Sequence, residues 1–146
     1  MATGEAAQII DALFVHCATL NVGSPPLPIS YPEVAFTPPM TTETQPKPKP
    51  YLQVDWFGNR PAWEGLSSGK LAQGLLQITV VWPRGAGIVA PAEAAQQVIG
   101  HFAKGTALFD GSVKVTINQE PWAATPITED TQLRIPVTVS WNAVAL

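Results

Sequence analysis

The strongest constraint on the fold is a strict alternation of apolar and other side chains near the end of the 146-residue chain. The apolar set is Leu133, Ile135, Val137, Val139 and Trp141, and the alternate set is Arg134, Pro136, Thr138 and Ser140. Because successive side chains of a strand point to opposite faces, this period of two predicts a β-strand with one buried face. Pro136 lacks an amide donor, so we expect an edge, a bulge or a neighbour on one side only.

Several other segments predict strands. Shorter alternating runs lie at Leu52, Val54 and Trp56, at Leu76, Ile78, Val80 and Trp82, and at Val113, Val115 and Ile117. The run from Ile29 to Phe36 also predicts a short strand, which Pro32 confines to an edge or a bulge. We expect the segment from Gly58 to Gly69, which contains Trp63, to form a loop or lid.

Two segments predict amphipathic helices. The first extends from about Gly4 to Leu20, because its apolar residues recur at steps of three and four. The second starts at Pro91, a residue favoured in the first helical turn, and Gly105 is its expected C-terminal stop. The polar faces of the strands alternate cleanly, so we expect an α+β fold. Its sheet is mainly antiparallel or mixed, with about four to five strands and both helices on one face.

A proline-rich tract separates two of the predicted strands. Residues Thr37 to Pro50 hold five prolines, a Lys-Pro alternation and one apolar side chain, Met40. This composition favours extended polyproline II structure and cannot bury enough apolar surface to fold alone. We therefore expect a long arm, inserted in a β-hairpin, that becomes ordered on contact with a neighbour. Residues 1–146, with this arm at 37–50, have the size of a single domain.

Composition excludes several classes of protein. Only 13% of the residues are charged, against about 25% in an average soluble domain. The net charge of -3 and the scattered basic residues argue against a nucleic-acid-binding module. No apolar run is long enough to span a membrane, and the acidic N-terminal segment does not resemble a signal peptide. The single cysteine, Cys17, excludes an intramolecular disulfide.

One motif suggests nucleotide chemistry. The segment from Gly85 to Ala90 matches the G-x-G-x-x-A pattern of dinucleotide-binding turns. Pro83 and Arg84 separate it from the preceding strand, and the helix starts too late for its amides to cradle a pyrophosphate. A flexible loop is the preferred interpretation, and a small nucleotide-binding enzyme that uses Gly85 and Gly87 is the alternative.

The remaining reactive residues do not predict a catalytic or metal site. His16 and Cys17 are adjacent on a helix and therefore point about 100° apart, and Cys17 lies on the apolar stripe. His101 is expected at the rim of the second helix. Two histidines and one cysteine do not supply a zinc-ligand set, so we expect no cofactor and no metal.

Tryptophan suggests an interaction surface instead. Trp63 and Trp122 lie next to prolines outside the predicted strands, where an interface anchor is as plausible as a structural role. Trp82 and Trp141 follow buried strand faces and are predicted to lie in the core.

Five segments and the proline-rich gap between the first two together resemble a known family. They are ISYPEVAFTPP before the proline-rich gap, YLQVDWF, GLLQITVVWPRGAG, PAEAAQQVIGHFAKG and LRIPVTVSWNA, in this order along the chain. They resemble the tail terminator, or tail completion, proteins of long-tailed bacteriophages, including a small family known as a phage-related domain of unknown function. More distantly, they resemble the lambda minor tail protein U.

The resemblance implies a virion protein that is made in the host cytoplasm and is not an enzyme. Such proteins form hexameric rings at the head-proximal end of the tail tube and end its polymerisation. They also present a docking surface to the head-completion or stopper protein, while DNA passes through the lumen without specific binding. The alternatives are another head-tail connector or a tail tube subunit.

The resemblance and the composition together suggest which residues contact other subunits. The expected contact residues are Met40, Lys47, Lys49, Arg60, Trp63, Trp122, Arg134 and Pro136. Lys47 and Lys49 would meet acidic patches on a neighbour, although plain solubility explains these two lysines equally well.

Overall fold

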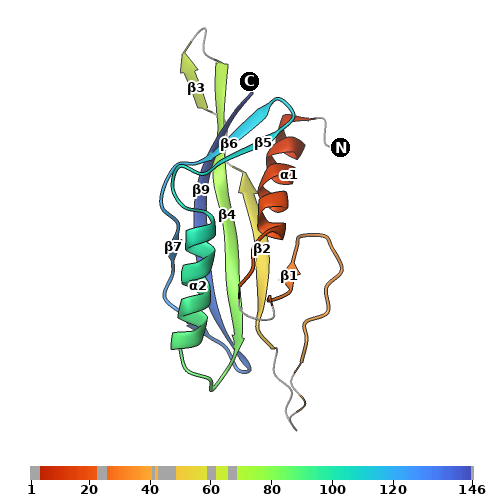
Figure 1. Ribbon diagram of the computed structural model, residues 1–146, viewed down its shortest axis with the longest axis vertical. Helices are drawn as coiled ribbons and strands as arrows, with labels where there is room; N and C mark the ends of the chain where they lie inside the picture. Colours follow the sequence, from red (N-terminus) through yellow and green to blue (C-terminus); the bar gives the residue numbers. More distant parts are fainter. Residues whose placement is uncertain are drawn as a thin grey trace.

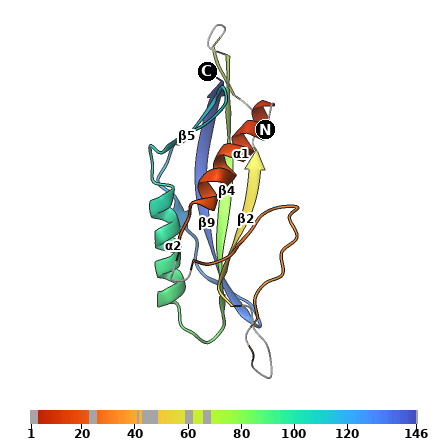
Figure 2. The same ribbon diagram turned by 45° about the vertical axis from the view of Figure 1, so that its right-hand side comes forward.

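Two helices lie on one face of a curled, mainly antiparallel sheet in the computed structural model (Figures 1 and 2). The structure describes residues 4–22, 26–40, 42, 49–58, 62–65 and 69–145. The elements are α1 (Glu5–Ala18), β1 (Ile29–Ser30), β2 (Tyr51–Gly58), β3 (Ala62–Gly65), β4 (Gly69–Pro83), α2 (Val89–His101), β5 (Ala107–Asp110), β6 (Val113–Ile117), β7 (Trp122–Ala123), β8 (Ile127–Thr128) and β9 (Gln132–Ala145). The expected α+β class is confirmed.

The sheet is built around its two longest strands. Its order is β1-β2-β4-β9-β6-β5, while β3 pairs with β4, and β7 and β8 pair with β9. Every pair is antiparallel except β1 with β2. The described part of the chain contains nine strands, so the expected four to five was too low. The four additional strands, β3, β5, β7 and β8, have two to four residues each, too few to produce a recognisable alternation.

The apolar face of β9 forms the centre of the core, as its alternation predicts. The five apolar side chains of the predicted alternation are all buried. Four of them, all except Leu133, belong to one core cluster with residues from β2, β4, β6 and both helices. From α1 this cluster takes Ile9, Leu13 and Cys17, and from α2 it takes Ala95 and Val98. Because one core contains residues of both helices, the helices cover the same face of the sheet.

Pro136 lies inside the sheet where the ladder beside β9 is interrupted. Its carbonyl oxygen accepts a hydrogen bond from the amide of Ala124 at 2.8 Å, on the side of β7 and β8. The N and C=O groups of one strand residue point to the same side, so the missing amide donor also faces this side. Strand β7 ends at Ala123 and β8 begins at Ile127, which leaves an irregular stretch opposite the proline. Pro136 thus pairs with Thr79 of β4 on one side and with no described strand residue on the other, which corresponds to the expected neighbour on one side only.

Both helices are close to their expected positions. Helix α1 ends two residues before Leu20, and its last turn is closed by the amide of Leu20 bonding to the carbonyl of Cys17. Helix α2 begins at Val89 rather than at Pro91. The proline still lies in the first turn, where its missing amide costs no helical hydrogen bond.

The predicted strand after residue 28 is much shorter than expected. Only Ile29 and Ser30 pair, and they pair parallel to β2, so the proline-rich tract does not lie within a β-hairpin. A turn ends β1: the amide of Val34 bonds to the carbonyl of Tyr31, Pro32 precedes Glu33, and Glu33 has a φ of 57°. Proline at the second position and a positive φ at the third are typical of a type II turn.

The segment from Gly58 to Gly69 contains a strand where a loop or lid was expected. Residues Ala62–Gly65 form β3, which pairs antiparallel with the beginning of β4 and extends the sheet at one end (Figure 1). These four residues follow Pro61, contain one aromatic side chain and end in glycine, which is too short a pattern to predict a strand.

Candidate interaction surfaces

The described residues offer neither a metal-ligand cluster nor a reactive thiol. They include no cluster of three or more His, Cys, Asp or Glu residues that would hold a metal ion. Cys17 is fully buried in the core, and burial raises the pKa of its thiol to about 12. A thiol with such a pKa is not a nucleophile near neutral pH. None of the described helices is long and apolar enough to cross a membrane.

The glycine-rich turn does not have the surroundings of a dinucleotide site. Gly85 and Gly87 have φ values of 90° and 82°, and they connect β4 to α2. A dinucleotide-binding turn belongs to a β-α-β unit with parallel strands, whereas β4 pairs with antiparallel neighbours. An open depression of about 290 Å³ lies beside the turn, lined by Pro83, Arg84, Gly85, Gly87, Ile88, Thr128 and Leu133.

The two histidines form a contact that the sequence did not reveal. The rings of His16 and His101 stack with centroids 4.1 Å apart and an angle of 16° between their planes. The Nε2 atom of His16 donates to the carbonyl of His101 at 2.8 Å, and the Nε2 atom of His101 donates to the carbonyl of His16 at 2.9 Å. Because carbonyls only accept, both Nε2 atoms carry hydrogen. This reciprocal pair joins the C-terminal turns of α1 and α2.

The histidine pair should make stability depend on pH. Burial lowers the pKa of His16 from its usual 6.5; the hydrogen bond to the His101 backbone opposes this shift, and the charge of His101 adds to it. The unfolded chain therefore takes up a proton at this residue before the folded chain does. The free energy of unfolding is expected to decrease as the pH falls through about 6.5, and to level off below the folded pKa.

Urea unfolding at pH 7.5 and pH 5.5 measures this effect. The matched variant is His16→Gln, which keeps an amide donor but does not titrate. The wild-type chain should lose more stability on acidification than the variant, and an equal or smaller loss would contradict the expectation.

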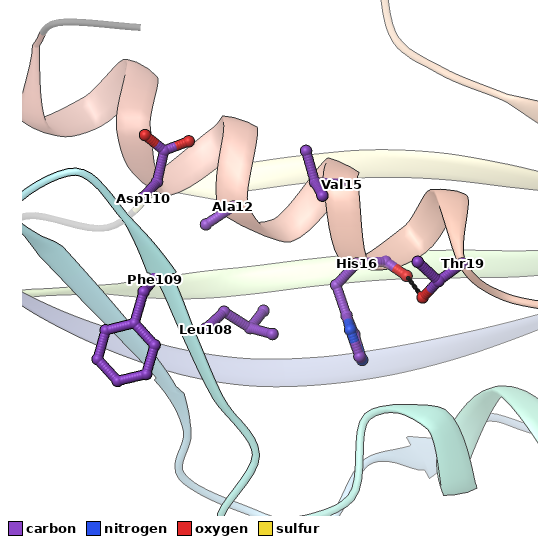
Figure 3. A pocket seen from close by; sticks show the side chains of 7 residues that line it. All are labelled: Ala12, Val15, His16, Thr19, Leu108, Phe109 and Asp110. Carbon is purple, nitrogen blue, oxygen red and sulfur yellow. Dashed lines mark hydrogen bonds between the residues drawn. The ribbon is translucent and has the colours of Figure 1, made fainter. Parts of the chain in front are cut away.

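A groove lies between α1 and β5. It has a volume of about 260 Å³ and is lined by Ala12, Val15, His16, Thr19, Leu108, Phe109 and Asp110 (Figure 3). Two of its apolar side chains are largely exposed, Val15 at 59% and Phe109 at 63%. The Thr19 hydroxyl donates to the carbonyl of His16 at 2.7 Å and closes the end of the groove that lies near α2. The groove therefore offers exposed apolar surface between two ordered elements.

Two carboxylates meet at the other end of this groove. Asp11 projects from α1 and Asp110 ends β5, where Gly111, with a φ of 57°, makes the tight turn into β6. A hydrogen bond with Asp11 raises the pKa of Asp110, desolvation and the charge of Asp11 raise it further, and the positive charge of the chain's N-terminus opposes this rise. This end of the groove therefore carries negative charge that a cation would relieve.

The face of the sheet opposite the helices forms a second surface, called here the outer sheet face. Residues paired directly across strands share a face, and the register places Gln53 of β2, Thr79 of β4 and Pro136 of β9 side by side. The Arg134 Nη2 atom lies 3.5 Å from the Gln53 Oε1 atom, and Gln53 Nε2 donates to Asp55 at 3.2 Å. The middle of the outer sheet face therefore carries a polar chain that crosses β4.

Exposed apolar side chains lie at both ends of the outer sheet face. Phe57 pairs with Leu75, and both are exposed. Trp122 pairs with Thr138 and is 46% exposed, while Ile127 pairs with Arg134 and is half exposed. The structure thus brings together three of the predicted contact residues, Trp122, Arg134 and Pro136, on one surface.

The other predicted contact residues belong to different regions. Met40 is 46% exposed and Lys49 is exposed, and both lie at the root of the proline-rich tract. Trp63 belongs to β3. Lys47 and Arg60 lie outside the described residues. The sequence does not point to Val15, Phe109 or the Asp11–Asp110 pair, because these residues come together only where α1 approaches β5.

Comparisons with known proteins agree with this description. A family model described as phage tail terminator protein matches residues 8–141. A solved structure with 19% sequence identity superimposes with a TM-score of 0.70 and covers 97% of this chain and 94% of the other. At this identity the similarity establishes the fold. No curated protein sequence matches this chain.

Proposed function

Because this chain belongs to the phage tail terminator protein family, and is therefore a structural component of a phage tail, we propose that it caps the tail tube. In this proposal six copies form a ring on the head-proximal end of the tube. The ring ends tube polymerisation and presents its free side to the head-completion or stopper protein. The tube protein, the stopper and further copies of the chain are its partners, and DNA passes through the lumen.

Besides family membership, the proposal is supported by the exposed apolar side chains of the outer sheet face. The outer sheet face extends over β2, β4 and β9 and bears exposed Phe57, Leu75, Trp122 and Ile127, while both described helices pack on the other side. Interface centres are depleted in charge and enriched in aromatic side chains. A subunit held between a tube, a stopper and two lateral neighbours needs such surface on several sides.

The proposal predicts that the outer sheet face controls tail length. The double variant Trp122→Ala and Arg134→Ala should fold, since both side chains are at least partly exposed, but should dock poorly on the tube. Phage carrying it should produce abnormally long tails and a lower titre, as measured by electron microscopy and plaque assay. A contact that combines a tryptophan anchor with an arginine is typically worth more than about 2 kcal/mol.

The control is Val89→Ala, which removes an exposed apolar side chain from α2 on the helical side of the sheet. It should leave tail length unchanged. Normal tails with the double variant would contradict a docking role for this face. Micrographs of the purified wild-type protein test the ring itself: closed rings support the proposal, whereas long tubes would indicate a tube subunit.

A further inference from the structure

The two ends of the proline-rich tract, residues 36–40 and 49–50, are held together and are called here its root. The amide of Lys49 donates to the carbonyl of Pro39 at 2.7 Å, which fixes the two ends of the tract against each other. The ring of Phe36 packs on the ring of buried Tyr51, with centroids 5.2 Å apart, and anchors the root to β2. Exposed Met40 and Lys49 therefore emerge close together, one apolar and one cationic.

The groove between α1 and β5 has the complementary chemistry. Its exposed apolar residues, Val15 and Phe109, suit a thioether, since methionine sulfur packs well against aromatic rings. Asp110 lines the same groove and Asp11 lies beside it on α1, so this end of the groove carries acidic side chains that suit an ammonium group. Asp11 and Val15 are four residues apart on α1 and so lie on the same side of the helix. An apolar contact and an ion pair can therefore form at the same time.

The root of the proline-rich tract does not reach the α1–β5 groove of the same chain. The root belongs to the β1–β2 end of the sheet, whereas β5 is at the other end of the strand order. In both Figures 1 and 2, α1 lies between β5 and the coloured segment that ends at residue 40. A contact between two different surfaces of neighbouring copies is heterologous, which is the type of contact that generates a ring.

We propose that Met40 and Lys49 of one copy dock into the α1–β5 groove of the next copy, with Met40 against Val15 and Phe109 and with Lys49 at Asp11 and Asp110. The inference rests on the proposed ring and names its lateral contact. Prolines 38, 39 and 50 next to these residues restrict the free root and so lower the entropy lost on docking.

Cross-linking between copies tests the contact. Full-length Met40→Cys and Val15→Cys proteins are mixed and treated with a short bis-maleimide. The native Cys17 is buried and unreactive, and so it can remain. The mixture should give a covalent dimer that neither variant gives alone. A mixture of Met40→Cys with Phe57→Cys, which is exposed on the outer sheet face, is the matched control and should give none.

Charge reversal provides a second measurement. Introducing Lys49→Glu into the Met40→Cys protein should reduce the cross-linked fraction about tenfold, and Asp110→Lys in its partner should restore most of it. A cross-linked fraction that does not respond to either substitution would overturn the role of the ion pair, and circular dichroism of each variant checks that it folds.

The outcomes separate this inference from the ring itself. Rings seen by electron microscopy without a Met40–Val15 cross-link would overturn the contact and leave the ring intact. A double Met40→Cys and Val15→Cys chain that gives an open-ended ladder would support the contact and contradict a closed hexamer. A protein that stays monomeric by light scattering and does not cross-link would overturn the contact.

Discussion

Replacing Gly74 by alanine is expected to lower the free energy of unfolding by about 2–3 kcal/mol. Gly74 lies in β4 between Gly58 of β2 and Trp141 of β9. A Cβ atom at this position would overlap the backbone oxygen of Phe57 and would lie 2.6 Å from the indole ring of Trp141. Neither group can move away easily, since one is backbone in a paired strand and the other is a buried ring stacked on Trp56.

The matched control is Gly100→Ala, the same chemical change in α2. A Cβ atom there meets nothing within 4 Å. Alanine is favoured over glycine inside a helix, so this variant should be more stable by about 0.5–1 kcal/mol. Urea unfolding curves measure both differences. Equal shifts in the same direction would show that the glycine–indole contact does not limit this part of the sheet.

The sequence predicted the parts of the fold that have a long repeating pattern. The alternation around Val137 identified a strand with one buried face, and the structure places this strand next to β4 in the middle of the sheet. The same pattern placed Arg134 and Pro136 on the opposite face. Trp122 was predicted to be a contact residue, but the sequence did not show which strand it would join. Its pairing with Thr138 of β9 places it on the same face as Arg134 and Pro136.

The unpredicted features all depend on contacts between distant segments. Strand β7 has two residues, and its strand character comes only from its pairing with β9. His16 and His101 are 85 residues apart, and nothing in either local sequence indicates that the two rings stack. The Asp11–Asp110 pair arises in the same way, because a turn at Gly111 holds the end of β5 beside α1. Local patterns determine elements, whereas the candidate surfaces come from how the elements pack.

Leu13→Ala is expected to have the largest effect on stability among these substitutions. Leu13 is the central core residue of α1 and is 0% exposed. Removing a fully buried leucine side chain costs about 2–5 kcal/mol, since transfer free energy and packing contacts are both lost. Helix α1 also forms one wall of the groove that contains Val15 and Phe109. The variant should therefore lose cross-linking between copies as α1 detaches, in addition to unfolding at lower urea concentrations.

Val15→Ala provides the matched control two residues further along the same helix. Its side chain is 59% exposed, so the free energy of unfolding should change by less than about 0.5 kcal/mol. If the groove receives Met40 of a neighbour, this variant should still weaken association in light-scattering titrations. Loss of association without loss of stability would distinguish a contact surface from a structural one. A Val15→Ala protein that associates as the wild type does would indicate that the apolar contact depends on Phe109 instead.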